Sequence, residues 1–112
     1  YIGDVCDAIY RIAKKGNIGE TYHISTNKII SIKELVKKIC DMTSIKFNDL
    51  VKVSKERQGK DQVYLLNTSK LRKKLDWKDK ISLEDGMKKT LYWIDQKLDY
   101  LKRLPRNYKH KI

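Results

Sequence analysis

The chain has 112 residues, of which 36% are charged, and its formal net charge is +12 at pH 7. A chain of this length accommodates one domain with a modest core, because short chains bury a smaller fraction of their surface than long ones. No apolar run approaches the roughly 20 residues that span a bilayer, and no signal-like segment opens the sequence. The composition therefore excludes a membrane-spanning protein and indicates a soluble, folded one.

The first segment has the pattern of a helix followed by a strand. Asp4 is a residue type that caps helices, and apolar residues recur behind it with the helical period as far as Gly16. Residues 20–25 then alternate polar and apolar side chains, as strands do. The opening letters "YIGD" resemble the end of a strand that meets a helix, so we also expect a further segment ahead of Tyr1.

The middle of the chain has the pattern of a helix and two strands joined by a polar loop. Ser31 and Glu34 have the spacing of a capping box, ahead of an amphipathic pattern that runs to about Thr43. The stretches "LVKVS" (50–54) and "VYLLN" (63–67) are typical of extended segments.

The last third of the chain has the pattern of two helices and a basic tail. Thr68 or the residue before it can cap a short basic helix, and Trp77, which follows this helix, is expected to fold back onto the core. Ser82 and Asp85 precede a long amphipathic pattern that Pro105 breaks.

The order of these elements predicts a small mixed α/β unit, whose short strands cannot form a large sheet alone. We expect this unit to occupy residues 1–95. Residues 96–112 are expected to be the end of the last helix and a basic tail.

The positive charge makes nucleic acid a candidate partner, because positive potential attracts phosphate whatever its sequence. However, lysines decorate the polar faces of all the predicted helices, and only Lys70 to Lys80 form a dense cluster. No aromatic platform of the RNA-recognition type is visible. Solvated helix faces are the favoured interpretation, and a stand-alone nucleic-acid-binding module is the alternative.

Candidate catalytic and metal-binding residues are few. Tyr10 and Lys14 have a spacing at which lysine can lower a tyrosine pKa, but about one such pair arises by chance among seven tyrosines and many lysines. Cys6 and Cys40 occupy apolar helical positions, so we expect free thiols in a reducing, cytoplasmic compartment. With His23 they form no metal-ligand spacing. We therefore assign this chain no catalytic residue and no metal.

The polar loop "KERQGKDQ" carries side chains that suit a pyrophosphate. Arg57 offers a planar fork for phosphate, Gly59 allows close backbone approach, and Lys60 adds a charge. Tyr64 follows with a ring and a polar tip. An ordinary solvated connection is the alternative, because loops are usually polar.

Four stretches together resemble a known family. They are "YIGDVCDAIY", "GETYHIS", "ISIKELVKKI" and "RQGKDQVYLLNTSKLRKKLDWKDKISLEDGMKKTLYWI". Their order and intervals are similar to the C-terminal part of extended short-chain dehydrogenases/reductases that act on nucleotide sugars. The resemblance is greatest to dTDP-glucose 4,6-dehydratases and related epimerases, and it spans residues 1 to about 95.

The resemblance implies that the chain is the substrate-binding lobe of a homodimeric, Rossmann-type, NAD-dependent enzyme. The NAD-binding and catalytic residues of such enzymes precede this part. Hydride leaves the sugar for NAD, elimination or inversion follows, and hydride returns, so a 4,6-dehydratase and a 4-epimerase are both open.

The resemblance also implies six substrate-binding residues. Arg57 would hold the diphosphate of the nucleotide sugar. The others are Lys60, Asp61 and Tyr64 near the phosphate and ribose, and His23 or Asn27 near the opening of the pocket.

Overall fold

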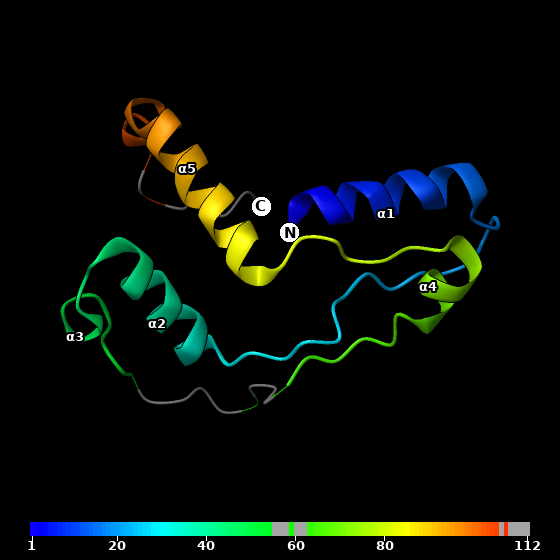
Figure 1. The fold of residues 1–112 in the computed structure, drawn as a ribbon, viewed down its shortest axis with the longest axis horizontal. Coiled ribbons are helices and arrows are strands. Elements are labelled where there is room, and N and C mark those ends of the chain that lie inside the picture. Colours follow the sequence, from blue (N-terminus) through cyan, green and yellow to red (C-terminus); the bar gives the residue numbers. More distant parts are fainter. Residues whose placement is uncertain (55–58, 60–62, 106, 108–112) are drawn as a thin grey trace. The chain divides into compact units, whose positions relative to one another are not determined.

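A computed structural model describes residues 1–54, 59, 63–105 and 107 of the chain. The chain divides into two compact units, Tyr1–Ser82 and Leu83–Ile112. Helices α1 to α4 belong to the first unit and α5 to the second (Figure 1). Within the described part of the chain, no helix is long and apolar enough to cross a membrane.

Helix α1 (Ile2–Lys15) begins earlier than predicted and includes Asp4 in its first turn. The expected capping role of Asp4 is therefore wrong. Asp4 is buried, and its Oδ2 instead accepts a hydrogen bond from the backbone N–H of Ile81 at 3.0 Å. The predicted end of the helix at Gly16 is confirmed. A Cβ at this position would lie 2.5 Å from the carbonyl oxygen of Ile12, so the close turn requires glycine.

The core of the first unit lies where α1 meets α4 (Ser69–Leu75), and the chain after α4 runs back along α1 (Figure 1). Trp77 folds back onto this core, as predicted, and is only 2% exposed. Its indole Nε1–H donates a hydrogen bond to the backbone oxygen of Asp4 at 3.0 Å. The buried side chains are those of Ala8, Leu71, Leu75 and Trp77, with Ile12, Tyr22 and Ile24 packed around them.

Arg11 of α1 fastens the C-terminal end of α4. Its Nη1 donates to the backbone oxygens of Leu75 at 3.1 Å and Asp76 at 2.9 Å, while its Nε pairs with Asp7 at 2.9 Å. The last carbonyl groups of a helix lack partners within the helix, so these bonds satisfy groups that would otherwise need water. Asp76 turns the chain at φ 46°, a left-handed conformation that aspartate tolerates better than most residues.

Helix α2 (Ile32–Thr43) has the predicted capping box and the predicted end. The Ser31 hydroxyl accepts from the backbone N–H of Glu34 at 3.1 Å, and the Glu34 carboxylate accepts from the backbone N–H of Ser31 at 3.0 Å. A single-turn helix, α3 (Phe47–Leu50), follows α2 and was not predicted.

The three predicted strands are absent from the described residues, which contain helices but no strand. Residues 20–25 and 63–67 lie outside helices without ladder partners, and residue 50 closes α3. The described residues therefore form a helical unit, and the predicted mixed α/β arrangement is not found among them. Alternating side chains can favour an extended backbone, but a strand also requires a neighbour whose N–H and C=O groups it can bind.

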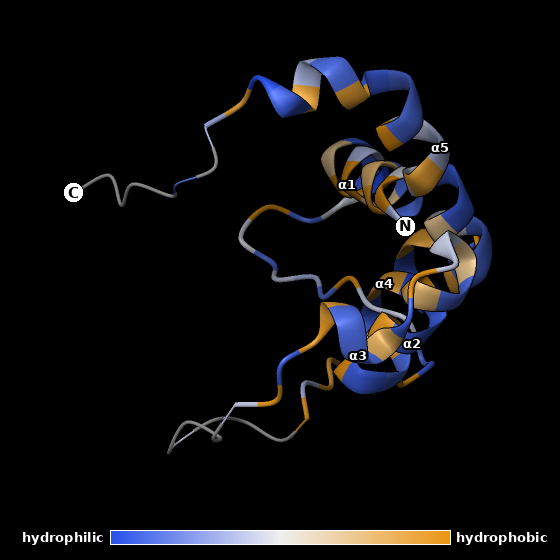
Figure 2. Ribbon diagram, turned by 90° about the vertical axis from the view of Figure 1, so that its left-hand side faces the viewer, coloured by the Kyte–Doolittle hydropathy of each residue, from blue (hydrophilic) through white to orange (hydrophobic). Residues whose placement is uncertain are grey.

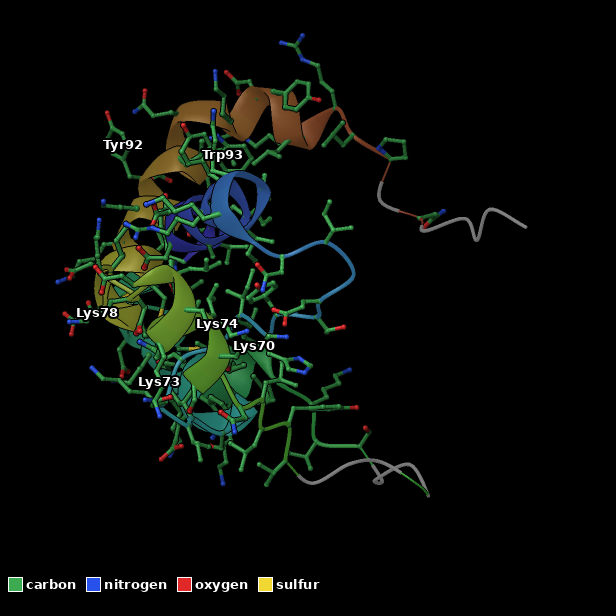
Figure 3. All side chains as sticks on the ribbon, turned by 90° about the vertical axis from the view of Figure 1, so that its right-hand side faces the viewer. Lys70, Lys73, Lys74, Lys78, Tyr92 and Trp93 are labelled. Carbon is green, nitrogen blue, oxygen red and sulfur yellow. The ribbon has the colours of Figure 1, made fainter. Side chains whose placement is uncertain are left out.

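Helix α5 (Leu83–Lys102) is the described helix of the second unit and ends before Pro105, as predicted. Hydrophilic and hydrophobic residues alternate along its ribbon (Figure 2). Several of its aromatic side chains are exposed, and Figure 3 shows two of them, Tyr92 and Trp93.

Candidate functional site

The predicted substrate-binding residues are only partly within the described chain. His23, Asn27 and Tyr64 are all exposed, and Tyr64 reaches 84% exposure. No hydrogen bond or ion pair among described residues joins any two of these three. Arg57, Lys60 and Asp61 lie outside the described residues.

Gly59 is the described residue of the polar loop. Its φ of 76° lies in the left-handed region that favours glycine over residues with a side chain. Gly59 therefore has a backbone conformation that a residue with a side chain would adopt less readily.

A cluster around Glu20 holds the start of the segment that carries His23. The Glu20 carboxylate accepts from the Tyr22 hydroxyl at 2.9 Å and pairs with Lys74 at 3.2 Å and Lys70 at 3.3 Å. Lys70 also donates to the backbone oxygen of Thr21 at 2.9 Å and lies over the Tyr22 ring, 4.7 Å from its centre. Residues 20–22 are therefore attached to α4 by side-chain contacts although they form no ladder.

These contacts stabilise the charged form of Glu20. The hydrogen bond from Tyr22, followed by those from the two lysines, lowers the pKa of Glu20 from 4.5 to about 2. No local pattern indicated this pairing, because Glu20 and Lys74 are 54 positions apart.

The low pKa of Glu20 predicts an acid-sensitive contribution to stability. A carboxylate whose pKa is lower in the folded state stabilises the fold fully above its unfolded pKa of 4.5, and this contribution is lost as the pH falls through about 2. We expect Glu20→Gln to flatten the pH dependence of unfolding in that window and to leave the dependence above it unchanged. Urea denaturation at a series of pH values measures this. A Glu20 carboxyl that titrates by NMR at its ordinary pKa would contradict the prediction.

A second cluster centres on Arg72 of α4. Its Nε donates to the hydroxyl of buried Thr68 at 3.0 Å, and its Nη2 donates to the backbone oxygen of Ser25 at 3.2 Å and to Asp79 Oδ1 at 2.6 Å. The guanidinium also lies over the ring of Trp77, 5.0 Å from its centre. The hydrogen bond from Arg72 holds the pKa of Asp79 below its ordinary value.

The lysines after residue 69 are less available than their number suggests. Figure 3 shows Lys70, Lys73 and Lys74 on α4 and Lys78 just after it. Two of these four, Lys70 and Lys74, share Glu20, whereas Lys73 and Lys78 pair with no described residue. Internal pairing therefore reduces the charge that this cluster offers to a polyanion.

The other sites considered from the sequence gain little support. The Lys14 ammonium lies 5.8 Å from the ring centre of Tyr10, and both side chains are exposed. Cys6 and Cys40 are free thiols, the first exposed and the second buried. Among the described residues, no three histidine, cysteine or acidic side chains are grouped to hold a metal ion.

One cavity of about 420 Å³ lies at the end of α2 and the start of α3. None of the predicted substrate-binding residues lines it. Its walls are Lys37, Cys40, Asp41, Ser44, Ile45, Lys46 and Phe47.

Comparison with known proteins identifies the class of this chain. The profile of the family described as GDP-mannose 4,6 dehydratase matches residues 1–90. A trifunctional UDP-glucose 4,6-dehydratase/UDP-4-keto-6-deoxy-D-glucose 3,5-epimerase/UDP-4-keto-L-rhamnose-reductase of Arabidopsis thaliana is 34% identical over 96 residues, which cover 86% of this chain and 14% of that protein.

Bacterial relatives align over a similar part of the chain. The dTDP-glucose 4,6-dehydratase of Haemophilus influenzae is 33% identical over 103 residues, covering 83% of this chain and 30% of the relative. The dTDP-glucose 4,6-dehydratase of Escherichia coli is 28% identical over 114 residues, covering 93% of this chain and 32% of the relative.

These matches show the family to which the chain belongs. It belongs to the GDP-mannose 4,6-dehydratase family, and the predicted resemblance to dTDP-glucose 4,6-dehydratases is confirmed. The chain spans between 14 and 32% of the length of these three relatives.

Proposed function

We propose that residues 1–95 form the substrate-binding lobe of a nucleotide-sugar 4,6-dehydratase, a lyase, and that this lobe binds the diphosphate of the substrate. Residues 96–112 are then the end of the last helix and a basic tail. The observation that carries the proposal is the family match, because it covers residues 1–90 and includes the polar loop.

The diphosphate is the shared feature of the substrates that the comparisons name. The Arabidopsis relative is named for UDP-glucose, the bacterial relatives for dTDP-glucose, and the family for GDP-mannose. Bases and sugars differ among these names, whereas each contains a nucleoside diphosphate. A lobe that is shared by proteins named for different bases and sugars is suited to bind the diphosphate, which these substrates have in common.

Each proposed residue has a role that its chemistry suits. Arg57 holds the two phosphates with its planar fork, and Lys60 adds a second positive charge. Asp61 and Tyr64 lie near the phosphate and ribose, where a carboxylate and a phenol can bind hydroxyl groups. His23 or Asn27 would lie near the opening of the substrate pocket of the whole enzyme. The exposure of His23, Asn27 and Tyr64 supports these roles, because all three side chains are accessible to a ligand.

NAD is the cofactor that we propose for the whole enzyme, bound outside this chain. The residues of the chain itself do not fit a dinucleotide, because its glycines form no Gly-x-Gly-x-x-Gly fingerprint between a strand and a helix. Gly3 lies within α1, and Gly16 ends that helix. This chain therefore contributes binding energy. By binding the diphosphate, which does not react, it positions the sugar for reaction.

The assembly and location of the enzyme are also proposals. We propose a cytoplasmic homodimer whose small-molecule partner is a nucleotide sugar, without nucleic acid. The pairing of Lys70 and Lys74 with Glu20 supports the exclusion of a polyanion, because it neutralises part of the basic cluster.

Calorimetric titration of the full-length protein that contains this chain tests the proposal. We expect UDP-glucose or dTDP-glucose to bind at least about tenfold more tightly than the matching nucleoside monophosphate, because charged hydrogen bonds to the second phosphate are lost. Single-stranded and duplex DNA at two salt concentrations are the comparison ligands. Binding to DNA alone, with an affinity that falls steeply as salt rises, would reject the proposal.

A further inference from the structure

The backbone around Asn27 is held by side chains rather than by regular structure. Asn27 lies at a bend in an irregular segment. On one side of it, the Thr26 hydroxyl donates to Asp79 Oδ2 at 3.3 Å, and on the other, the backbone N–H of Lys28 donates to that hydroxyl at 3.2 Å. One residue earlier, the backbone oxygen of Ser25 accepts from Arg72 at 3.2 Å. The hydroxyl of Thr26 therefore connects both flanks of Asn27 to Asp79.

Asp79 is itself held against the core. Its Oδ1 accepts from Arg72 at 2.6 Å, which leaves Oδ2 for Thr26. Arg72 is fixed in turn by Thr68, which is only 3% exposed, and by the buried ring of Trp77. A continuous set of contacts thus runs from the core through Arg72 and Asp79 to the bend.

We propose that Thr26 and Asp79 are positioning residues, which orient Asn27 toward the nucleotide sugar through the hydrogen bond between the Thr26 hydroxyl and the Asp79 carboxylate. This inference rests on the proposed function, because Asn27 is one of its substrate-binding residues. Neither Thr26 nor Asp79 touches the substrate in this proposal. Their role is to restrict the conformations of an exposed bend before the ligand arrives, which lowers the ordering cost of binding.

Thr26→Val tests the link, because valine has nearly the shape of threonine and lacks its hydroxyl, so the bond to Asp79 and the bond from the Lys28 N–H are both lost. The Arg72–Asp79 ion pair and the core remain intact in this variant. In the full-length protein we expect the KM for the nucleotide sugar to rise about three- to tenfold, with kcat unchanged, because the two hydrogen bonds of the hydroxyl that order the bend are lost. Thr26→Ser keeps the hydroxyl and should retain the wild-type KM. A variant that was merely less stable would lower the active fraction, and therefore apparent kcat, without raising KM.

A double-mutant cycle with Asn27→Ala shows whether Thr26 acts through Asn27. If it does, adding Thr26→Val to Asn27→Ala raises KM no further. Independent, multiplicative effects would overturn the positioning role while leaving the proposed function intact. An Asn27→Ala variant with wild-type KM would instead reject the role of Asn27 in the proposed function, and the inference with it.

A measurement without substrate tests the structural half of the inference separately. We expect Thr26→Val to lower the NMR backbone order parameters of residues 26–28 in the chain, and Thr26→Ser to leave them unchanged. Equal order parameters in wild type and Thr26→Val would overturn the inference whatever the substrate proves to be.

Discussion

Replacing Trp77 with alanine is expected to lower the free energy of unfolding by about 3 to 5 kcal/mol, the cost typical of removing a large buried aromatic side chain. Trp77 is the largest of the fully buried side chains and contacts the core residues of α1 and α4. Its loss also leaves the backbone oxygen of Asp4 without its indole donor and Arg72 without the ring beneath it. Urea denaturation followed by far-ultraviolet circular dichroism measures the change.

Trp93 provides a matched control on α5. It is 51% exposed, so we expect Trp93→Ala to cost less than about 1 kcal/mol. Trp77→Phe separates packing from hydrogen bonding, because phenylalanine keeps an aromatic ring but cannot donate to Asp4. An intermediate loss is expected for it. Equal stabilities of Trp77→Ala and Trp93→Ala would show that the core does not depend on this indole.

Arg57→Ala is expected to weaken nucleotide-sugar binding by the full-length protein by about 2 to 3 kcal/mol, or roughly 30- to 150-fold. The reason is the loss of a charged, two-pronged donor to the diphosphate. Arg57 lies outside the described residues, so the expectation comes from its chemistry and its place in the family match. The KM and kcat for UDP-glucose and dTDP-glucose provide the measurement.

Arg103→Ala is the charge-matched control for Arg57, since it removes an exposed guanidinium beyond the family match. Its KM should stay at the wild-type value. Arg57→Lys should recover only part of the lost affinity, because a lysine keeps the charge but not the planar fork. If Arg57→Ala altered neither KM nor kcat, the proposed diphosphate role would be wrong.

Local features of the fold could be predicted from the sequence because their causes lie within a few residues. The capping box of Ser31 and Glu34 connects groups three positions apart, and it correctly marked the start of α2. Gly16 correctly marked the end of α1. Such contacts form wherever the residues occur at the right spacing, whatever the rest of the chain does.

Features that depend on distant residues were missed. The strands were predicted from alternation, which reports side-chain direction but does not supply a pairing partner. Likewise, the lysines of α4 were interpreted as solvated, although Glu20 binds two of them. Thr26 and Asp79 are 53 positions apart, and no periodicity in the sequence connects them. The sequence therefore predicted which residues belong to the candidate site. The contacts that orient these residues could be seen only in the structure.

Residues 63–66, which have no ladder partner among the described residues, affect how the protein behaves in solution. Four successive apolar side chains, each at least half exposed, accompany a backbone without ladder partners. Such an exposed apolar stretch favours association between molecules. Mutual repulsion from the net charge of +12 opposes that association, and dissolved ions screen this repulsion. The protein should therefore be most soluble at low ionic strength. Added salt should cause it to precipitate by association of this stretch between molecules.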